Sequence, residues 1–198
     1  MKRIIVNVLL AGLISAPVFA SETAGISAKQ PHIDSLRAIL VKLVRLDEQV
    51  QTALVDSRTL RTGSVRAEIV KVSAELTNIE RQMAGVVSET KTELIQIPSF
   101  NDAEVRQYTR TVVSYTGRLR SRVNFIYEGI LKVYSTGNRG PKMRDALSPV
   151  PGAGGGVDLK QIARSGEASS KLVANVKKLK TTSDKLNAAG RWMYLISK

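Results

Sequence analysis

The sequence predicts an all-α protein, an elongated bundle of three to four long helices. Apolar residues recur at spacings of three and four over several long stretches of the chain, which is the pattern of one helix face. Alternating apolar and polar runs, typical of strands, are almost absent. Glycine and proline gather between the periodic stretches, where turns are expected.

An export signal is predicted at the N-terminus, in residues 1–20. Two basic residues are followed by a mainly apolar run to Pro17 and by small or β-branched residues before the expected cleavage between Ala20 and Ser21. The apolar run is shorter than the roughly 20 residues that a membrane-spanning helix needs. We therefore expect cleavage, a mature protein in the periplasm, secreted or at the cell surface, and one helical domain over residues 21–198.

The first two helices are predicted from apolar residues that fall on one face. The first is expected from Pro31, a residue suited to a first helical turn, to about Asp56. The second is expected over residues 64–97, where Ser64 can cap the start and Pro98 cannot continue the helix. Its apolar residues alternate steps of four and three, which is a heptad pattern.

The third helix, over residues 102–135, follows a short turn. Asn101 and Glu104 resemble a capping box at its start. Its apolar seam is expected to include Tyr108 and Tyr115, which we interpret as core or inter-helix packing. Because a short connection joins two helices of similar length, the second and third helices are predicted to form a long antiparallel hairpin.

A loop is predicted between the third and the last helix. Residues 137–157 contain six glycines and three prolines, a composition typical of an exposed, flexible segment. The last helix is expected from Asp158 to about Ile196, with a bend or fraying near Gly166. Small residues such as Gly190 occupy seam positions, where they weaken a hydrophobic seam and permit close approach of another helix.

The basic excess of the chain is confined to its second half. Residues 21–100 carry 10 Lys or Arg and 10 Asp or Glu, whereas residues 101–198 carry 18 and 7. This asymmetry favours an anionic partner such as phospholipid, lipopolysaccharide, cell-wall polymer or an acidic protein. A generally basic, well-solvated surface would have the same composition. Nucleic acid is not expected as a partner of an exported protein.

Candidate contact residues come from basic positions and from the apolar end of the chain. Arg118 and Arg122 share a helix face, and lysines gather on the last helix. Residues 192–196 form a dense apolar cluster, which either docks on the bundle or contacts a partner or a membrane, since Trp and Tyr favour interfaces. The residues singled out for contact with a partner or an anion are Arg118, Arg122, Arg139, Lys177, Lys178, Lys185, Trp192 and Tyr194.

No catalytic residues, cofactor or metal ligands are predicted. Cysteine is absent, which excludes thiol nucleophiles, thiolate metal sites and disulfides within this sequence. A Ser-His-Asp triad would have to use His32, the one histidine, which we interpret as an exposed residue of a first helical turn. The Gly-rich segment 151–156 lacks the Gly-Lys-Ser/Thr of a phosphate-binding loop, so a linker is the better interpretation.

One short motif carries a family resemblance. Thr136-Gly137-Asn138-Arg139-Gly140, at the end of a predicted helix, resembles a sequence in the pilus-tip minor pilin family of type IV secretion systems. The resemblance implies an exported, helix-rich, non-enzymatic protein with a role in pilus assembly or host-cell adhesion.

Three functional hypotheses follow from the sequence. The preferred one is an exported, non-enzymatic helical protein that acts through protein–protein interaction in the cell envelope, for example in a secretion system or a pilus. The second is a binding module for anionic envelope polymers or lipids, acting through the basic C-terminal half. The third is a secreted toxin or effector. An envelope or appendage protein is the expected partner, and self-association is an open alternative.

Overall fold

The computed structural model describes residues 26–61, 64, 66–96, 102–134 and 159–197. These residues form four α-helices, α2 (Ile26–Thr59), α3 (Arg66–Gln96), α4 (Ala103–Tyr134) and α5 (Leu159–Ile196). The all-α prediction is confirmed. The predicted signal at 1–20, the predicted loop at 137–157 and the motif around Arg139 lie outside the described residues.

The chain divides into two compact units, Met1–Pro31 and His32–Lys198. The second unit contains α3, α4, α5 and the part of α2 that begins at His32. The packing described below is that of the second unit alone.

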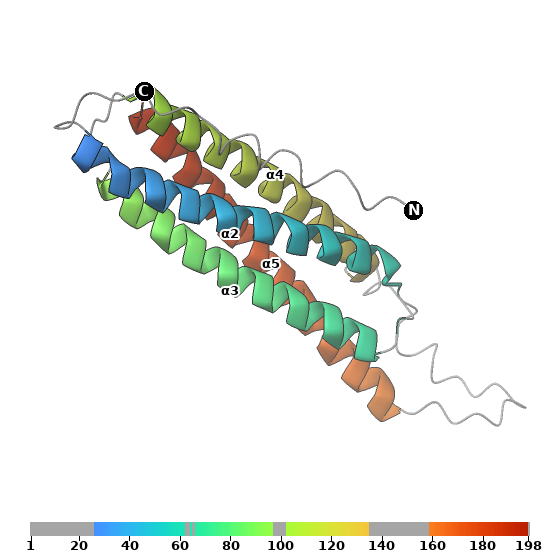
Figure 1. Ribbon diagram of the computed structural model, residues 1–198. Helices are drawn as coiled ribbons and strands as arrows, with labels where there is room; N and C mark the ends of the chain where they lie inside the picture. Colours follow the sequence, from blue (N-terminus) through green and yellow to red (C-terminus); the bar gives the residue numbers. More distant parts are fainter. Residues whose placement is uncertain (1–25, 62–63, 65, 97–101, 135–158, 198) are drawn as a thin grey trace, which may run out of the picture. The chain divides into compact units, whose positions relative to one another are not determined.

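The helices of this unit alternate in direction along the chain (Figure 1). Asn175 pairs with Ser73 and Thr182 pairs with Glu80, both across 102 residues of sequence, so α3 and α5 are parallel. α4 runs opposite to both (Figure 1). α3 and α4 are therefore antiparallel, and α5 packs against both of them.

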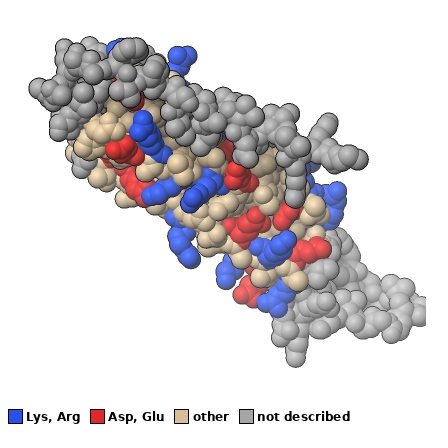
Figure 2. Space-filling view, in the orientation of Figure 1, with Lys and Arg blue, Asp and Glu red and all other residues tan. Residues whose placement is uncertain are grey.

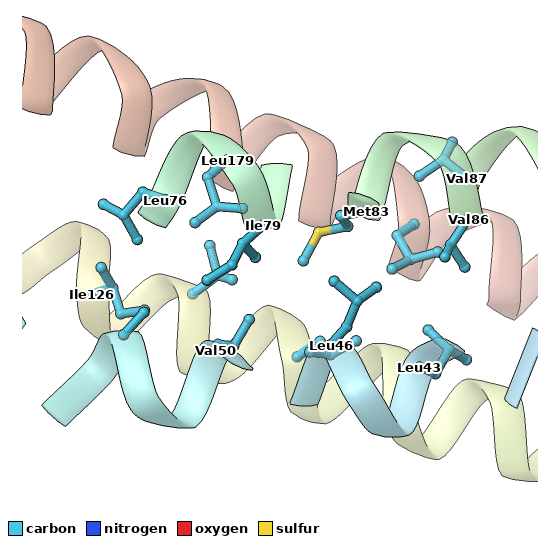
Figure 3. Close-up of a cluster of buried hydrophobic side chains, with 14 of the residues drawn as sticks. Leu43, Leu46, Val50, Leu76, Ile79, Met83, Val86, Val87, Ile126 and Leu179 are labelled. Atoms are coloured by element: carbon cyan, nitrogen blue, oxygen red, sulfur yellow. The ribbon is translucent and has the colours of Figure 1, made fainter. Parts of the chain in front are cut away.

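The core lies between all four helices and is almost entirely aliphatic. Leu46 of α2, Met83 of α3, Ile126 of α4 and Leu179 of α5 point into it (Figure 3), and none is more than 1 % exposed. Each such side chain contributes about 1.5–3 kcal/mol on burial. Core packing of this kind holds α3 and α5 side by side without any disulfide.

The start of α2 differs from the prediction. The helix begins at Ile26, and Pro31 lies inside it rather than in its first turn. Proline has no N–H, so one backbone hydrogen bond of the helix is missing at this point. The boundary between the two units of the chain falls at the same residue.

The cap of α4 also differs from the prediction. Asp102 provides a cap, because its Oδ1 atom accepts hydrogen bonds from the backbone N–H groups of Glu104 (2.8 Å) and Val105 (3.3 Å). A carboxylate at this position also interacts favourably with the positive end of the helix dipole.

The seam of α4 contains threonines where tyrosines were predicted. Thr109 and Thr116 are buried, whereas Tyr108 and Tyr115 are half-buried and pack at the edge of the core. A fully buried phenol needs a hydrogen-bond partner. At the edge, Tyr108 Oη instead accepts a 2.7 Å hydrogen bond from Arg37 Nε.

Gly190 allows α4 and α5 to approach closely, as the sequence predicts. A Cβ atom at Gly190 would lie 2.9 Å from Thr116 Oγ1. Just beyond the end of α5, the hydroxyl of Ser197 lies 2.8 Å from that of Thr109 in α4. α5 continues as one helix through Gly166, which is exposed, so the predicted fraying there is wrong.

Candidate binding groove between helices α3 and α5

Two hollows follow one another along the seam between α3 and α5. The first, of ≈ 550 Å³, lies between residues 66–81 of α3 and 167–175 of α5. The second, of ≈ 380 Å³, lies between residues 80–91 of α3 and 178–185 of α5. We call the two together the α3–α5 groove.

The groove is open because the side chains along the line where α3 and α5 meet are short. Ser73, Ala74, Thr77 and Ala84 of α3 and Thr182 of α5 all line it. Short side chains let the two helix backbones pack closely but fill little of the space above their line of contact. The result is a long shallow depression rather than an enclosed cavity.

Hydrogen bonds fix the register of the two helices beneath the groove. Asn175 Nδ2 donates to Ser73 Oγ (2.8 Å) and to Thr77 Oγ1 (2.9 Å). Thr182 Oγ1 donates to Glu80 Oε1 (2.9 Å), and this carboxylate is buried. Unpaired buried polar groups are costly, so these bonds favour one register over all others.

The α5 wall of the groove is a regular row of long side chains. Lys171 lines the first hollow, and Lys178 and Lys185 line the second. Trp192 follows at the same spacing of seven residues, which keeps it on the same side of the helix, and it is 60 % exposed. The row therefore has three ammonium groups and one indole.

The groove carries an uncompensated positive charge. Its described lining contains six basic side chains and two acidic ones, Glu80 and Glu167. Glu80 is already paired, since Lys178 Nζ lies 3.1 Å from its Oε2 atom. The other basic residues form no ion pair with any described residue, and they are Arg66, Arg81, Lys91, Lys171 and Lys185.

The seam between α2 and α4 is closed by charge pairing instead. Asp47 of α2 is 11 % exposed in its side chain and lies 2.5 Å from Arg122 Nη1 and 3.7 Å from Arg118 Nη1. Arg122 donates its hydrogen bond to the backbone carbonyl of Asp47 (3.1 Å). The Arg118 guanidinium also lies over the Tyr115 ring, 5.2 Å from its centre.

The two remaining seams are also bridged by ion pairs. Between α2 and α3, His32 Nδ1 lies 2.8 Å from Glu93 Oε1, and Lys42 pairs with Glu89. Basic and acidic side chains are interspersed on the face that shows α2 and α3 (Figure 2). His32 is thus half-buried and paired, not the exposed first-turn residue that was predicted.

Asp184 bridges α4 and α5. Its carboxylate accepts hydrogen bonds from Arg120 Nε (2.7 Å) and Lys180 Nζ (2.9 Å). Partial burial raises the pKa of Asp184, but these two cations outweigh that effect and hold the pKa below its ordinary value.

The structure distributes the predicted contact residues over different surfaces. Lys178 and Lys185 line the groove, and Trp192 continues their row. Lys177 is exposed but does not line the groove. Arg118 and Arg122 belong to the α2–α4 seam, where they pair with Asp47, and Arg139 lies outside the described residues.

The apolar C-terminal cluster divides between core and surface. Met193 is fully buried and Tyr194 is half-buried, whereas Trp192, Leu195 and Ile196 are exposed. Docking on the bundle therefore applies to Met193, and partner binding by the exposed residues stays a prediction. The core-facing residue of the cluster docks on the bundle, and its other apolar residues remain on the surface.

Three basic residues of the groove were not singled out from the sequence. Arg66, Arg81 and Lys91 lie in the half of the chain whose net charge is zero, so a search by regional charge passed over them. Their position on α3 beside the seam was visible in the heptad pattern. Which helix packs against that side was not, because parallel packing of α3 and α5 is a long-range contact.

Metal and membrane-spanning elements were sought among the described residues. No group of three or more His, Cys, Asp or Glu in that part of the chain could hold a metal ion. None of the helices described is long and apolar enough to cross a membrane.

Comparison with known proteins gives no relative from which a function could be transferred. The chain matches no protein-family model, no curated protein and no solved structure.

Proposed function

We propose that this chain is an exported, non-enzymatic helical protein that acts by binding another protein in the cell envelope, with the α3–α5 groove as its contact surface. A secretion machine or a pilus is a setting consistent with the motif at 136–140. The export step rests on the pattern of residues 1–20.

The observation that carries this proposal is the unpaired charge of the groove. In each of the other three seams a carboxylate of one helix pairs with a basic side chain of the other, as Asp47 does with Arg122. In the α3–α5 groove five basic side chains have no such partner. Like charges held along one line repel one another, so this arrangement favours an occupant that brings negative charge.

Cross-linking from inside the groove tests the proposal. Asn78 lines the first hollow and Thr181 the second, and both are exposed. A photo-reactive amino acid at either position, in intact producing cells, is expected to give a covalent adduct with one protein. The same residue at Ser121, which is exposed on α4, is the matched control and is expected to give none.

The measurement is the identity of the molecule cross-linked at positions 78, 181 and 121. Absence of any protein adduct at 78 and 181 would contradict the proposal, and so would equal adduct formation at all three positions. Adducts with lipid or glycan alone would favour the second hypothesis, an anionic-polymer or lipid-binding module.

Export is tested separately by N-terminal sequencing of the protein recovered from producing cells. We expect the recovered chain to begin at Ser21. A chain that keeps residues 1–20 and remains in the cytoplasm would contradict the envelope setting.

A further inference from the structure

We propose that the occupant of the α3–α5 groove is an acidic amphipathic helix of the partner protein, and that Trp192 covers one end of it. This inference rests on the proposed function and specifies the chemistry of the partner. A helix of this kind would extend the bundle by one member, with its apolar stripe between α3 and α5 and its carboxylates toward the basic row.

The dimensions of the groove fit a helix. The described lining extends from Arg66 to Lys91 along α3, which corresponds to about 38 Å at 1.5 Å per residue. A partner helix of about 25 residues has the same length. Two straight parallel helices with short side chains between them offer a third helix a continuous line of contact.

The lining of the groove combines apolar surface with basic side chains, as an acidic amphipathic helix requires. Val70, Ala74, Ala84, Val87 and Ala168 provide apolar surface within the two hollows. The basic side chains stand on both helices around this surface. A helix with a narrow apolar stripe and flanking Asp or Glu matches both parts at once.

The spacing of the α5 row matches a helical partner better than a flexible polyanion. Lys171, Lys178 and Lys185 are seven residues apart, which is two helical turns or about 10.5 Å. Carboxylates at heptad positions of a partner helix repeat at the same distance. A flexible polyanion would neutralise the charge but would leave the apolar lining exposed to water.

Trp192 supplies an anchor at one end of the row. Trp192 is 60 % exposed, although large apolar residues are usually buried. Tryptophan is enriched among the residues that carry binding energy at interfaces, because it covers a large apolar area with little loss of conformational freedom. Contact with the partner would remove this exposed surface from water.

The chain contains a single Trp, so its fluorescence reports on this end of the groove alone. We would titrate the protein recovered from producing cells with a blocked peptide of about 25 residues that lacks aromatic residues, with Leu and Ala at the a and d positions and Glu at e and g. Binding is expected to shift the emission of Trp192 to shorter wavelength and to reduce its quenching by acrylamide.

Two control ligands separate helix recognition from simple charge attraction. A peptide of the same composition in scrambled order keeps the charge but loses the apolar stripe, and polyglutamate keeps only the charge. Both are expected to bind at least about tenfold more weakly and to leave Trp192 open to acrylamide. Equal binding of the ordered and scrambled peptides would overturn the inference in favour of a polyanion site.

Charge reversal in the protein provides the matched variants. Lys171→Glu combined with Lys185→Glu is expected to weaken peptide binding by about tenfold or more, whereas Lys177→Glu, on the same helix but outside the groove, changes it less than about threefold. Circular dichroism checks that the variants keep their helix content. Equal loss in both variants would contradict the assignment.

Anionic vesicles are the remaining comparison. If phosphatidylglycerol vesicles shield Trp192 as well as the ordered peptide does, the occupant is a lipid surface and the inference fails. If cross-linking from Asn78 and Thr181 finds a protein whose captured segment is not acidic, this inference fails while the proposed function stands. Peptide binding with no protein adduct in cells would contradict the proposed function, and it would show only that the groove can bind a helix of this kind.

Discussion

The α2–α4 seam and the α3–α5 groove use charge in opposite ways. In the first, the carboxylate of Asp47 is 11 % exposed and serves both Arg122 and Arg118. In the second, the nearly buried carboxylate of Glu80 serves Lys178, while five other basic residues have no acidic partner among the described residues. Both seams border the same core.

This difference separates charges that hold the bundle together from charges that are available to a ligand. A paired group near the core contributes to stability only while its partner remains. An exposed group without a partner contributes little to stability, so substituting it changes binding and leaves the fold intact. The predictions below test this division, from the largest expected effect to the smallest.

Removing the carboxylate of Asp47 from the α2–α4 seam should have the largest effect on stability. Asp47→Ala is expected to lower the free energy of unfolding by about 2–3 kcal/mol, because Arg122, only 27 % exposed, loses its counter-charge. Urea denaturation at pH 7 measures the change. Glu48→Ala, at the adjacent exposed position, is the control and is expected to change it by less than about 0.5 kcal/mol. Equal losses of stability in the two variants would show that the pairing of Asp47 does not hold the bundle together.

The second-largest effect is expected when a side chain is added at Gly190, where α4 and α5 lie close together. Gly190→Ala is expected to cost about 1–2 kcal/mol, since its Cβ atom would lie 2.9 Å from Thr116 Oγ1 and would displace that side chain. Gly129→Ala is the matched control, because Gly129 is on α4 with nothing within 4 Å of the added carbon. It is expected to stabilise the protein by up to about 1 kcal/mol through helix propensity. A stable Gly190→Ala protein would mean that Thr116 moves freely.

The pH dependence of the α4–α5 bridge should be smaller. The folded state holds the pKa of Asp184 below its unfolded value, so its contribution is complete above about pH 4 and is lost as the pH falls through the folded pKa. Asp184→Asn is expected to cost less than about 1 kcal/mol at pH 7, because the side chain is partly exposed. The difference between the two proteins should shrink in urea titrations below about pH 4. A difference that grows toward acid pH would have the wrong sign.

The smallest effect is expected in the groove itself. Lys171→Glu and Lys185→Glu are each expected to change the free energy of unfolding by less than about 0.5 kcal/mol, measured as for Asp47→Ala. Neither lysine forms an ion pair that the substitution would break. A loss as large as that of Asp47→Ala would show that the groove lysines hold the bundle together, and the comparison of the two seams would fail.

The helices were predictable because each depends on local signals. The heptad of α3 and its end before Pro98 placed that helix within two residues of its observed bounds. The start of α2 was wrong because Pro31 suits a first helical turn, and nothing nearby showed that the helix already exists five residues earlier. Asp102 and Asn101 are both good caps, so residue type could not choose between them.

The groove was only partly predictable because it depends on which helices become neighbours. Lys178, Lys185 and Trp192 were found from composition on one helix, but Lys177 was included with them for the same reason. Composition does not distinguish side chains that face the seam from those one residue away. The pairing of Arg118 and Arg122 with Asp47 needed the same long-range information.

The bonds beneath the groove have a consequence for the order in which the protein is assembled. Asn175 and Ser73, like Thr182 and Glu80, are separated by 102 residues. Contacts between such distant parts of a chain form late, since a long loop must close first. α3 and α5 therefore meet only after α5 itself has been synthesised. Newly made chains would carry the basic residues of both walls long before a groove exists, so partner binding would report that folding is complete.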